Sequence, residues 1–206
     1  HYVDNNCRMG DGDLVLVDAG AEFNGYAGDV TRCFPVNGSF SAAQRAVYEV
    51  VLAAQEAAIA KVVAGNPFGE VHQAALSKIC EGLVELGVVP VTASSVEEGG
   101  EYKPWFMHNT SHWLGLDVHD AGSYHVDGDF RPLEPGMCLT VEPGLYFRED
   151  DLSVPEEFRG LGIRIEDDVV VTAEGGPEIL SGGVPKTIEA VEEACAAQGV
   201  SLPGGV

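Results

Sequence analysis

The amino-acid sequence predicts an α+β fold built from two related halves. Two segments share one layout: a glycine, an apolar interior, an acid six positions after the glycine, and a second glycine two positions later. They are residues 12–20, which include Asp18, and residues 136–144, which include Glu142. Helical patterns of apolar residues occupy much of the chain between them. The repeat indicates that each half presents an acid from the end of a buried strand.

The size and composition of the chain favour one domain. It has 206 residues, of which 45% are apolar, enough for one substantial core. No apolar run approaches the roughly 18 residues of a membrane span, and no signal peptide precedes the first strand. The sequence begins at His1 rather than at a methionine, and we expect it to be the C-terminal part of a longer protein.

Charge and cysteine usage exclude several classes of protein. The net charge of -22, from 33 acidic and 11 basic residues, repels nucleic acid and anionic lipid. The five cysteines are odd in number and never form a Cys-x-x-Cys pair, which argues against a disulfide scaffold or a zinc knuckle. We therefore expect reduced thiols and a cytoplasmic protein.

The first half is predicted to place two acids side by side. Residues 12–20 form a near-continuous apolar strand, typical of burial on both faces, that ends at Asp18. Gly25 and Gly28 then serve as turn residues, and a second strand begins at Asp29. If the two strands pair, Asp18 and Asp29 come together.

Two helices are predicted to follow. Ser41 caps a long amphipathic helix that stops near Gly65, and a second helix covers residues 68–86. His72 lies on the second helix without another ligand at helical spacing, so we interpret it as a surface or core histidine. Residues 97–103 are predicted to form an exposed acidic loop.

The second half repeats the arrangement of the first. A strand over residues 162–172 presents Glu166 much as the first half presents Asp29. A last helix is predicted over roughly residues 187–198. The Pro/Gly-rich tail that follows is predicted to fray.

A histidine-rich stretch lies between the halves. Residues 108–120 contain His108, His112 and His119, three of the chain's six histidines, interleaved with large apolar residues such as Trp113. Buried imidazoles require polar partners or a metal ion. The stretch is therefore a candidate functional site.

If the acids converge on this stretch, the repulsion between their negative charges must be offset. Two carboxylates about 4 Å apart repel by roughly 4 kcal/mol at an effective dielectric constant near 20, so either raised pKa values or bound cations are needed. The set Asp18, Asp29, Glu142, Glu166 and His112 is rich in oxygen and has one imidazole, which suits Mn, Co or Zn. It is too large for one tetrahedral ion and suits two ions that share bridging carboxylates.

Sequence motifs of other catalytic classes are absent or incomplete. The sequence has no Gly-x-Ser-x-Gly elbow, no phosphate-binding loop and no complete dinucleotide fingerprint. His108 and His112 stand four residues apart, as in a zinc-binding helix. However, Asn109 occupies the position of the glutamate that this motif requires, and Gly115 disfavours a helix.

Five segments closely resemble the metal-binding motifs of the Xaa-Pro aminopeptidases, or aminopeptidase P, of the pita-bread metallopeptidase family. They occur in the same order and are residues 17–20, 28–32, 111–120, 140–144 and 162–167. The resemblance covers residues 1–206 as the catalytic C-terminal domain of that family, whose N-terminal domain is absent from this sequence. It implies two pseudo-symmetric halves with a curved, mostly antiparallel sheet covered by helices.

The resemblance also implies a set of metal ligands. Asp18 would chelate one ion, Asp29 and Glu166 would bridge two ions, and His112 and Glu142 would complete the second site. The ions would be two divalent metals, with Mn2+ as the first choice and Co2+ or Zn2+ as alternatives. A hydroxide between them would attack the carbonyl before proline, so that the enzyme removes the first residue from peptides with proline in the second position.

Further residues acquire roles from the same resemblance. Glu142 would shuttle a proton and His119 would stabilise the oxyanion, while His108 and His1 would contact the substrate. Arg164, two residues from Glu166 and on the same strand face, would orient Asp18. The acids within the histidine stretch, Asp117 and Asp120, would be structural supports.

The resemblance leaves two alternatives. Proline dipeptidases of the same family carry longer insertions between the later ligands than this chain does, and non-catalytic pita-bread binding modules have typically lost metal ligands that this chain retains. Beyond peptide substrates, we expect a homo-oligomer, a dimer or tetramer, in the full-length protein.

Overall fold

The computed structural model describes residues 4–197, so that His1 and the tail predicted to fray lie outside the described residues. Within this range, runs of antiparallel strands and runs of helices form an α+β arrangement, as predicted. The elements are β1 (Leu14–Ala19), β2 (Glu22–Phe23), β3 (Tyr26–Ala27), β4 (Val30–Pro35), α1 (Ala42–Ile59), α2 (Gly69–Glu85), α3 (Ala93–Gly99), β5 (His125–Val126), β6 (Asp129–Phe130), β7 (Cys138–Val141), β8 (Gly144–Tyr146), η1 (Glu156–Phe158), β9 (Gly162–Arg164), β10 (Asp167–Val170), β11 (Glu178–Ile179) and α4 (Ile188–Ala197).

In the first half of the chain, β1 and β4 form an antiparallel pair. This confirms the predicted pairing of the two strands. Asp18 lies opposite Thr31 in the register. Between these strands, β2 and β3 form a small hairpin whose turn residues, Asn24 and Gly25, have φ values of 52° and 84°. A two-residue hairpin turn that matches the twist of its strands requires such positive φ values. The hairpin returns the chain so that Asp29 directly precedes β4.

Burial of β1 differs from the prediction. The strand is half-buried at its start and exposed at its end, where Val17 is 40% exposed. β1 pairs only with β4 within the described residues, and its other edge has no strand beside it. A continuous apolar run therefore did not mean burial on both faces here.

Gly20 joins the end of β1 to this hairpin by a close backbone approach. A β-carbon at Gly20 would lie 1.7 Å from the carbonyl oxygen of Gly28, and this backbone atom cannot move without displacing Asp29. We predict that Gly20→Ala lowers the free energy of unfolding by about 1–3 kcal/mol and weakens metal binding. Urea denaturation measures the expected loss in the free energy of unfolding. Gly176→Ala, where a β-carbon meets nothing within 4 Å, is the control, and an equal effect of both substitutions would contradict the argument.

The second half repeats the first with one interruption. β7 pairs with β10 and β8 pairs with β9, both antiparallel. The prediction of one continuous strand over residues 162–172 is therefore wrong, because this segment breaks into β9 and β10 at Glu166. Pro143 breaks the partner strand at the same level, since proline has no backbone N–H for the ladder. The amide of Glu166 instead donates to the carbonyl of Thr31 at 3.1 Å, which links the two halves.

The helices follow the predicted pattern, with one earlier end. Ser41 caps α1 through a capping box with Gln44. The helix ends at Ile59 rather than near Gly65, because the chain turns there and Val62 becomes fully buried. Gly65 lies in the following loop, where its N–H donates to the carbonyl of Leu133 at 2.8 Å.

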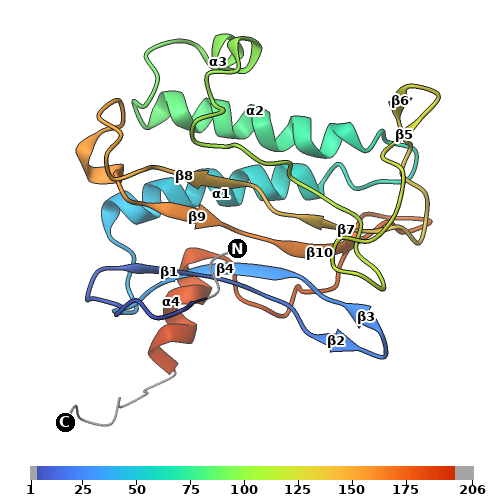
Figure 1. Cartoon of the computed structure of the whole chain (residues 1–206), viewed down its shortest axis with the longest axis horizontal. Coiled ribbons are helices and arrows are strands. Elements are labelled where there is room, and N and C mark those ends of the chain that lie inside the picture. Colours follow the sequence, from blue (N-terminus) through green and yellow to red (C-terminus); the bar gives the residue numbers. More distant parts are fainter. Residues whose placement is uncertain (1–3, 198–206) are drawn as a thin grey trace.

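Two long helices cover the strands. α1 and α2 lie side by side against the sheets, and α4 packs against β4 and α1 (Figure 1). Gly82 on α2 allows close packing, because a β-carbon there would lie 2.2 Å from the side chain of Val50 on α1. The apolar faces of both helices and the inner sides of the strands form one buried core. This core supports the strands from which the acids project.

The segment predicted as an exposed acidic loop is partly helical. The hydroxyl of Thr92 accepts from the N–H of Ser95 at 3.4 Å and so caps α3, whose Val96 is fully buried. Gly100 ends this helix in the left-handed conformation, with a φ of 69°. Glu98 and Glu101 are exposed, but Glu97 is half-buried and accepts from the side chain of Gln73, and the preceding Val96 anchors the helix to the core.

A buried ionic network also joins the halves. The carboxylate of Asp167, on β10, is fully buried and accepts hydrogen bonds from Arg32 of β4 at 2.6 Å and from Lys186 at 2.8 Å. Ser181 and Gln55 donate to the same carboxylate at 2.6 and 2.7 Å. These four donors lower the pKa of Asp167 far below its usual value, against the effect of burial.

Two further observations concern the whole described range. No disulfide joins any two of the five cysteines within residues 4–197. Among residues 4–197, no helix combines the length and the apolar character that crossing a membrane requires.

Candidate metal centre

Three predicted ligands form a compact group where the two halves meet. Asp29, His112 and Glu166 each offer one ligand atom, and these atoms all lie within 4.8 Å of one another. Asp29 directly precedes β4, Glu166 directly precedes β10, and His112 comes from the histidine stretch. The equivalent positions of the two acids reflect the predicted repeat.

The histidine stretch is held in place by the second half. Its backbone runs beside β7 in an extended conformation, with the N–H of Thr140 donating to the carbonyl of His112 at 3.0 Å. The N–H of Glu142 donates to the carbonyl of Thr110 at 2.8 Å. These bonds bring His112 and Glu142 to the same place, and they agree with the expectation that this stretch is not helical.

Glu142 and Asp18 lie beside the group and have different partners. Glu142 Oε1 lies 3.6 Å from His112 Nε2, close to the 3.5 Å that separates Asp29 Oδ2 from the same nitrogen. Asp18 is instead held by Arg164, whose Nη2 donates to Asp18 Oδ2 at 2.5 Å. Asp18 lies at the end of its strand as predicted, but its side chain is 35% exposed, so the predicted burial at this strand end is wrong.

The orientation of His112 suits metal ligation. Its Nδ1 lies 3.0 Å from the carbonyl oxygen of Trp113, which can only accept, so Nδ1 carries a proton. In the neutral imidazole, the lone pair is then on Nε2, which faces the carboxylates of Asp29 and Glu142. A backbone carbonyl that fixes the tautomer of a ligating histidine is a common feature of metal sites.

Burial and the charges of neighbouring acids raise the pKa of several acids in and beside the group. Burial raises the pKa of Glu142 to about 7, and burial together with the charge of Glu142 raises the pKa of Glu166 to about 8. Burial alone would lower the pKa of His112, but its hydrogen bond with Asp29 and the nearby carboxylates raise it to about 9. Partial burial likewise raises the pKa of Asp18. The group therefore fits divalent cations, which would stabilise all of these carboxylates in their ionised form.

A second row of polar side chains supports the group. Arg164 Nη1 donates to the hydroxyl of Tyr146 at 3.1 Å, and this hydroxyl lies 2.8 Å from His108 Nε2. His108 Nδ1 donates to the carbonyl of Asn109 at 2.8 Å, so in the neutral ring Nε2 accepts from Tyr146. Burial lowers the pKa of His108, which favours this neutral ring. Arg164 is thereby connected to both Asp18 and His108.

Sequence reasoning missed several of these supporting residues. Tyr146 and Thr31 both hydrogen-bond Arg164, and Asp168 Oδ2 accepts from the N–H of Asp29 at 3.1 Å. Thr31 lies inside one of the recognised motifs and Asp168 directly after another, which was the only available signal. A single sequence does not reveal which hydroxyl faces which carboxylate.

The remaining predicted residues lie outside the compact group. The ring of His119 lies 4.4 Å from that of His112, edge to face. Asp117 is exposed, and Asp120 accepts from the N–H of Ala121 at 3.0 Å. His72 is half-buried, in contrast to a purely surface histidine, and its Nδ1 lies 2.8 Å from Thr110 Oγ1.

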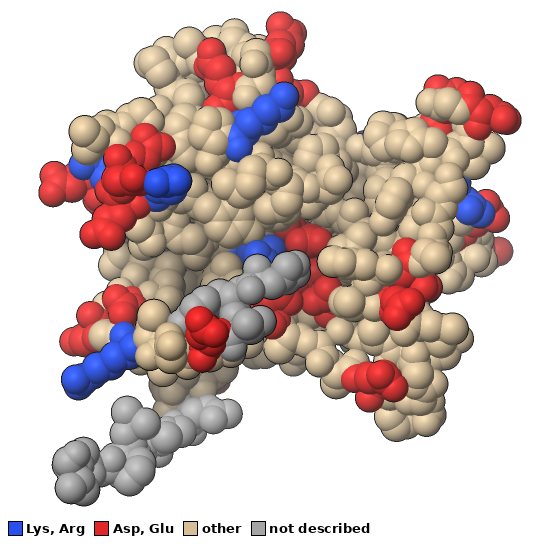
Figure 2. Space-filling view, in the orientation of Figure 1, with Lys and Arg blue, Asp and Glu red and all other residues tan. Residues whose placement is uncertain are grey.

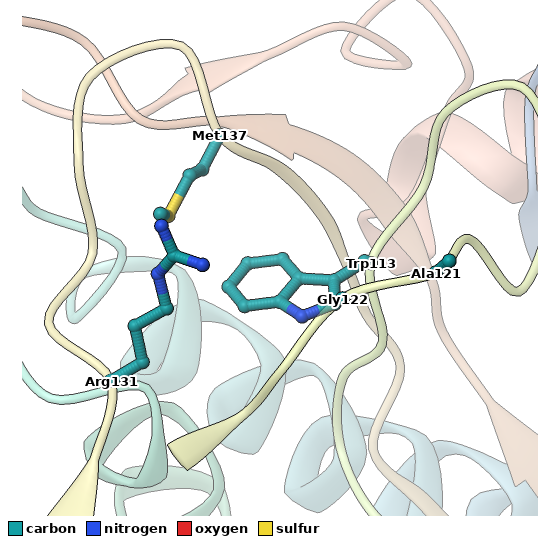
Figure 3. Close-up of a pocket in the computed structure, with 5 residues that line it drawn as sticks. All are labelled: Trp113, Ala121, Gly122, Arg131 and Met137. Carbon is teal, nitrogen blue, oxygen red and sulfur yellow. The ribbon is translucent and has the colours of Figure 1, made fainter. Parts of the chain in front are cut away.

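Acidic side chains gather in a hollow on one face of the molecule. Figure 2 shows Asp and Glu atoms, with Lys or Arg atoms beside them, in a hollow near the middle of this face. A separate cavity of about 140 Å³ is lined by Trp113, Ala121, Gly122, Arg131 and Met137 (Figure 3). It contains none of the predicted site residues and is smaller than the roughly 300 Å³ of typical ligand pockets, so the group of Asp29, His112 and Glu166 remains the candidate site.

Comparison with known proteins identifies related chains. The family profile described as "Metallopeptidase family M24" matches residues 1–173. A protein of Escherichia coli K12 named Xaa-Pro aminopeptidase is 50% identical over 192 residues, which cover 93% of this chain and 43% of that protein. Xaa-Pro aminopeptidase 1 of Streptomyces coelicolor is 48% identical over 202 residues, covering 96% of this chain and 40% of that protein.

Solved structures agree with this similarity. The Pseudomonas aeruginosa aminopeptidase PepP superposes with a TM-score of 0.94 at 48% identity, covering 96% of this chain and 44% of that one. A zinc-substituted aminopeptidase P of Escherichia coli in complex with product gives a TM-score of 0.91 at 50% identity, with coverages of 96% and 44%. This chain thus spans less than half the length of the relatives that it matches.

Proposed function

Because this chain belongs to metallopeptidase family M24 and has the pita-bread fold of its structural relatives, we propose that it removes the N-terminal residue from peptides with proline in the second position. The observation that carries the proposal is the compact group of Asp29, His112 and Glu166 beside Glu142. This group would supply the ligands of a metallopeptidase, and relatives of about 50% identity are named Xaa-Pro aminopeptidase.

Membership of the family implies divalent metal ions, and we propose two, with Mn2+ preferred and Co2+ or Zn2+ as alternatives. Asp29 and Glu166 would bridge them, Asp18 would complete one site, and His112 and Glu142 the other. The oxygen-rich set with one imidazole and no thiolate supports this choice. Bound divalent ions would supply Lewis acidity, which lowers the pKa of water and polarises a carbonyl group.

Glu142 is the proposed proton carrier. Its backbone is fixed by Thr110, and Thr140 Oγ1 donates to its Oε1 at 3.4 Å. Its Oε2 lies 4.0 Å from His108 Nδ1, on the side proposed to receive the substrate. The carboxylate would accept a proton from the attacking water at Oε2 and return it to the leaving nitrogen of proline.

Three other side chains would act on the substrate. His119, beside His112, would donate an N–H to the oxygen on which negative charge develops. His108 would contact the peptide, held in orientation by Tyr146 and Arg164. His1 retains the same proposed role but lies outside the described residues.

We further propose that residues 1–206 form one catalytic domain of a longer protein that acts in the cytoplasm as a dimer or tetramer. The single buried core and the share of the relatives that this chain spans support the domain assignment. The proposed partners are peptides, with no role for nucleic acid or membranes.

A peptide-length panel tests the activity. The protein at its full natural length, reconstituted with Mn2+, is expected to release the first residue from Xaa-Pro-Yaa tripeptides and not from Xaa-Ala-Yaa controls. Mass spectrometry of the products measures both.

Two results would contradict the proposal. Metal-dependent cleavage of Xaa-Pro dipeptides with none of tripeptides would instead identify a proline dipeptidase. Elemental analysis that finds no metal above a mock purification, even after reconstitution, would favour a non-catalytic binding module.

A further inference from the structure

Thr31 occupies a central position beneath the proposed metal centre. It lies on β4 opposite Asp18, and it is fully buried. A buried hydroxyl is stable only if its hydrogen bonds are satisfied. The neighbours of Thr31 therefore define what its hydroxyl does.

The neighbours of the Thr31 hydroxyl determine which hydrogen bond it accepts and which it donates. Arg164 Nε lies 3.1 Å from Thr31 Oγ1, and a guanidinium nitrogen can only donate, so Oγ1 is the acceptor. The proton of the hydroxyl is then directed to Glu166 Oε2, which lies 2.6 Å away. A hydrogen bond this short to a carboxylate is of the strong, charge-assisted kind.

The backbone of Thr31 holds the same glutamate. Its carbonyl oxygen accepts from the N–H of Glu166 at 3.1 Å, and from Arg32 Nη1 at 2.9 Å. Arg32 Nη1 also donates to the carbonyl of Glu166 at 2.5 Å. Glu166 is thus fixed at its backbone and at one carboxylate oxygen by a single residue of the other half.

We infer that Thr31 is a positioning residue of the metal centre, whose hydroxyl donates to Glu166 Oε2 and so sets the orientation in which this carboxylate would meet the metal ions. The same hydroxyl holds Arg164 in the position from which it reaches Asp18. One threonine therefore sets the geometry of a ligand from each half. This inference rests on the proposed metal centre.

The test is a calorimetric titration of the metal-free, full-length protein with Mn2+. Thr31→Val keeps the size of the side chain and removes the hydroxyl, so it is expected to weaken binding of at least one ion by about 10–100-fold, as loss of a supporting hydrogen bond at a metal ligand does. Thr31→Ser keeps the hydroxyl and is expected to stay within about threefold of the parent, since the donor to the ligand remains.

Two further variants complete the experiment. Thr172→Val removes a hydroxyl that donates only to loop carbonyls of residues 174 and 176, and it is expected to leave the affinity unchanged. Thr31→Ala removes the hydroxyl without placing a methyl group against Glu166. It is expected to weaken binding as Thr31→Val does, and it replaces that variant if circular dichroism shows Thr31→Val to be unfolded.

The outcomes separate this inference from the proposed function. Parent-like affinity of both Thr31→Val and Thr31→Ala overturns the inference and leaves the function intact. Equal losses in Thr31→Ser and Thr31→Val also overturn it, because the methyl packing rather than the hydroxyl would then matter. A parent protein that binds no Mn2+ overturns the proposed function and the inference together.

Discussion

Replacing either His112 or Glu142 with alanine is expected to lower the metal content and to reduce kcat/KM by at least about 10³-fold, which corresponds to roughly 4 kcal/mol of transition-state stabilisation. His112 supplies the one imidazole of the group, and its Nε2 lies between two carboxylates at 3.5 and 3.6 Å. Glu142 would be both a ligand and the proton carrier. Loss of either therefore removes metal affinity and chemistry together.

Both variants are expected to remain folded. The backbone hydrogen bonds that fix residues 112 and 142, to Thr140 and Thr110, do not involve the replaced side chains. Removal of Glu142 also removes a buried carboxyl group whose pKa is raised by burial. Elemental analysis, peptide kinetics and the circular dichroism of thermal unfolding measure the three quantities.

His125→Ala is the matched control for His112→Ala. His125 is exposed on β5 and stacks on Phe130, and its replacement should leave metal content and activity unchanged. Full metal content and activity in His112→Ala would contradict the proposed ligand set. Loss of activity in both histidine variants would point to a general effect on the protein instead.

Asp167→Asn is expected to lower the free energy of unfolding by about 3–5 kcal/mol, the range found when one partner of a buried ion pair is removed. Asp167 is fully buried, and the carboxylate accepts from Arg32 and Lys186. The amide keeps the shape but leaves both cations without their counterion. Because Arg32 also holds Glu166 and the network joins β4 to β10, the loss affects the contact between the halves.

The pH dependence of the free energy of unfolding also reports on the contribution of Asp167. The pKa of Asp167 is lowered in the folded protein, and the unfolded value is about 3.9. Its stabilising contribution is therefore fully present above the unfolded value and is lost as the pH falls towards the lower folded value. Between about pH 5 and pH 2, the stability of the parent should fall more steeply than that of Asp167→Asn.

Urea denaturation across this pH range checks both expectations. Asp150→Asn removes an acid that is paired with Arg148 in full contact with solvent and is expected to leave stability unchanged. A loss below about 1 kcal/mol in Asp167→Asn, similar to that of an exposed pair, would show that the buried network contributes little.

The sequence predicted the regular elements where the local signal was complete. Ser41 followed by Gln44 forms the capping box of α1, and the apolar faces of α1 and α2 are buried as expected. The pairing of β1 with β4 followed from two strand patterns around turn glycines. These features depend on residues close together in the chain, so a single sequence contains them.

Predictions that depended on distant residues were less accurate. The end of α1 is decided by burial of Val62, and the break at Glu166 is decided by Pro143 in the partner strand and by the carbonyl of Thr31. The exposure of β1 depends on the absence of a second neighbour for that strand among the described residues. Each of these causes depends on contacts with parts of the chain outside the segment that it affects.

The sequence by itself determined the family, the two related halves and the identity of the candidate ligands, because motif order and residue chemistry are properties of the chain. Only the tertiary structure decided how these ligands are oriented. Asp18 lies beside Arg164 at the edge, Asp29, His112 and Glu166 lie within 4.8 Å, and Thr31 holds Glu166 from the other half. The physical reason is that hydrogen bonds and repulsion between charges act over a few ångströms of space, whereas Thr31 and Glu166 are 135 positions apart in the chain.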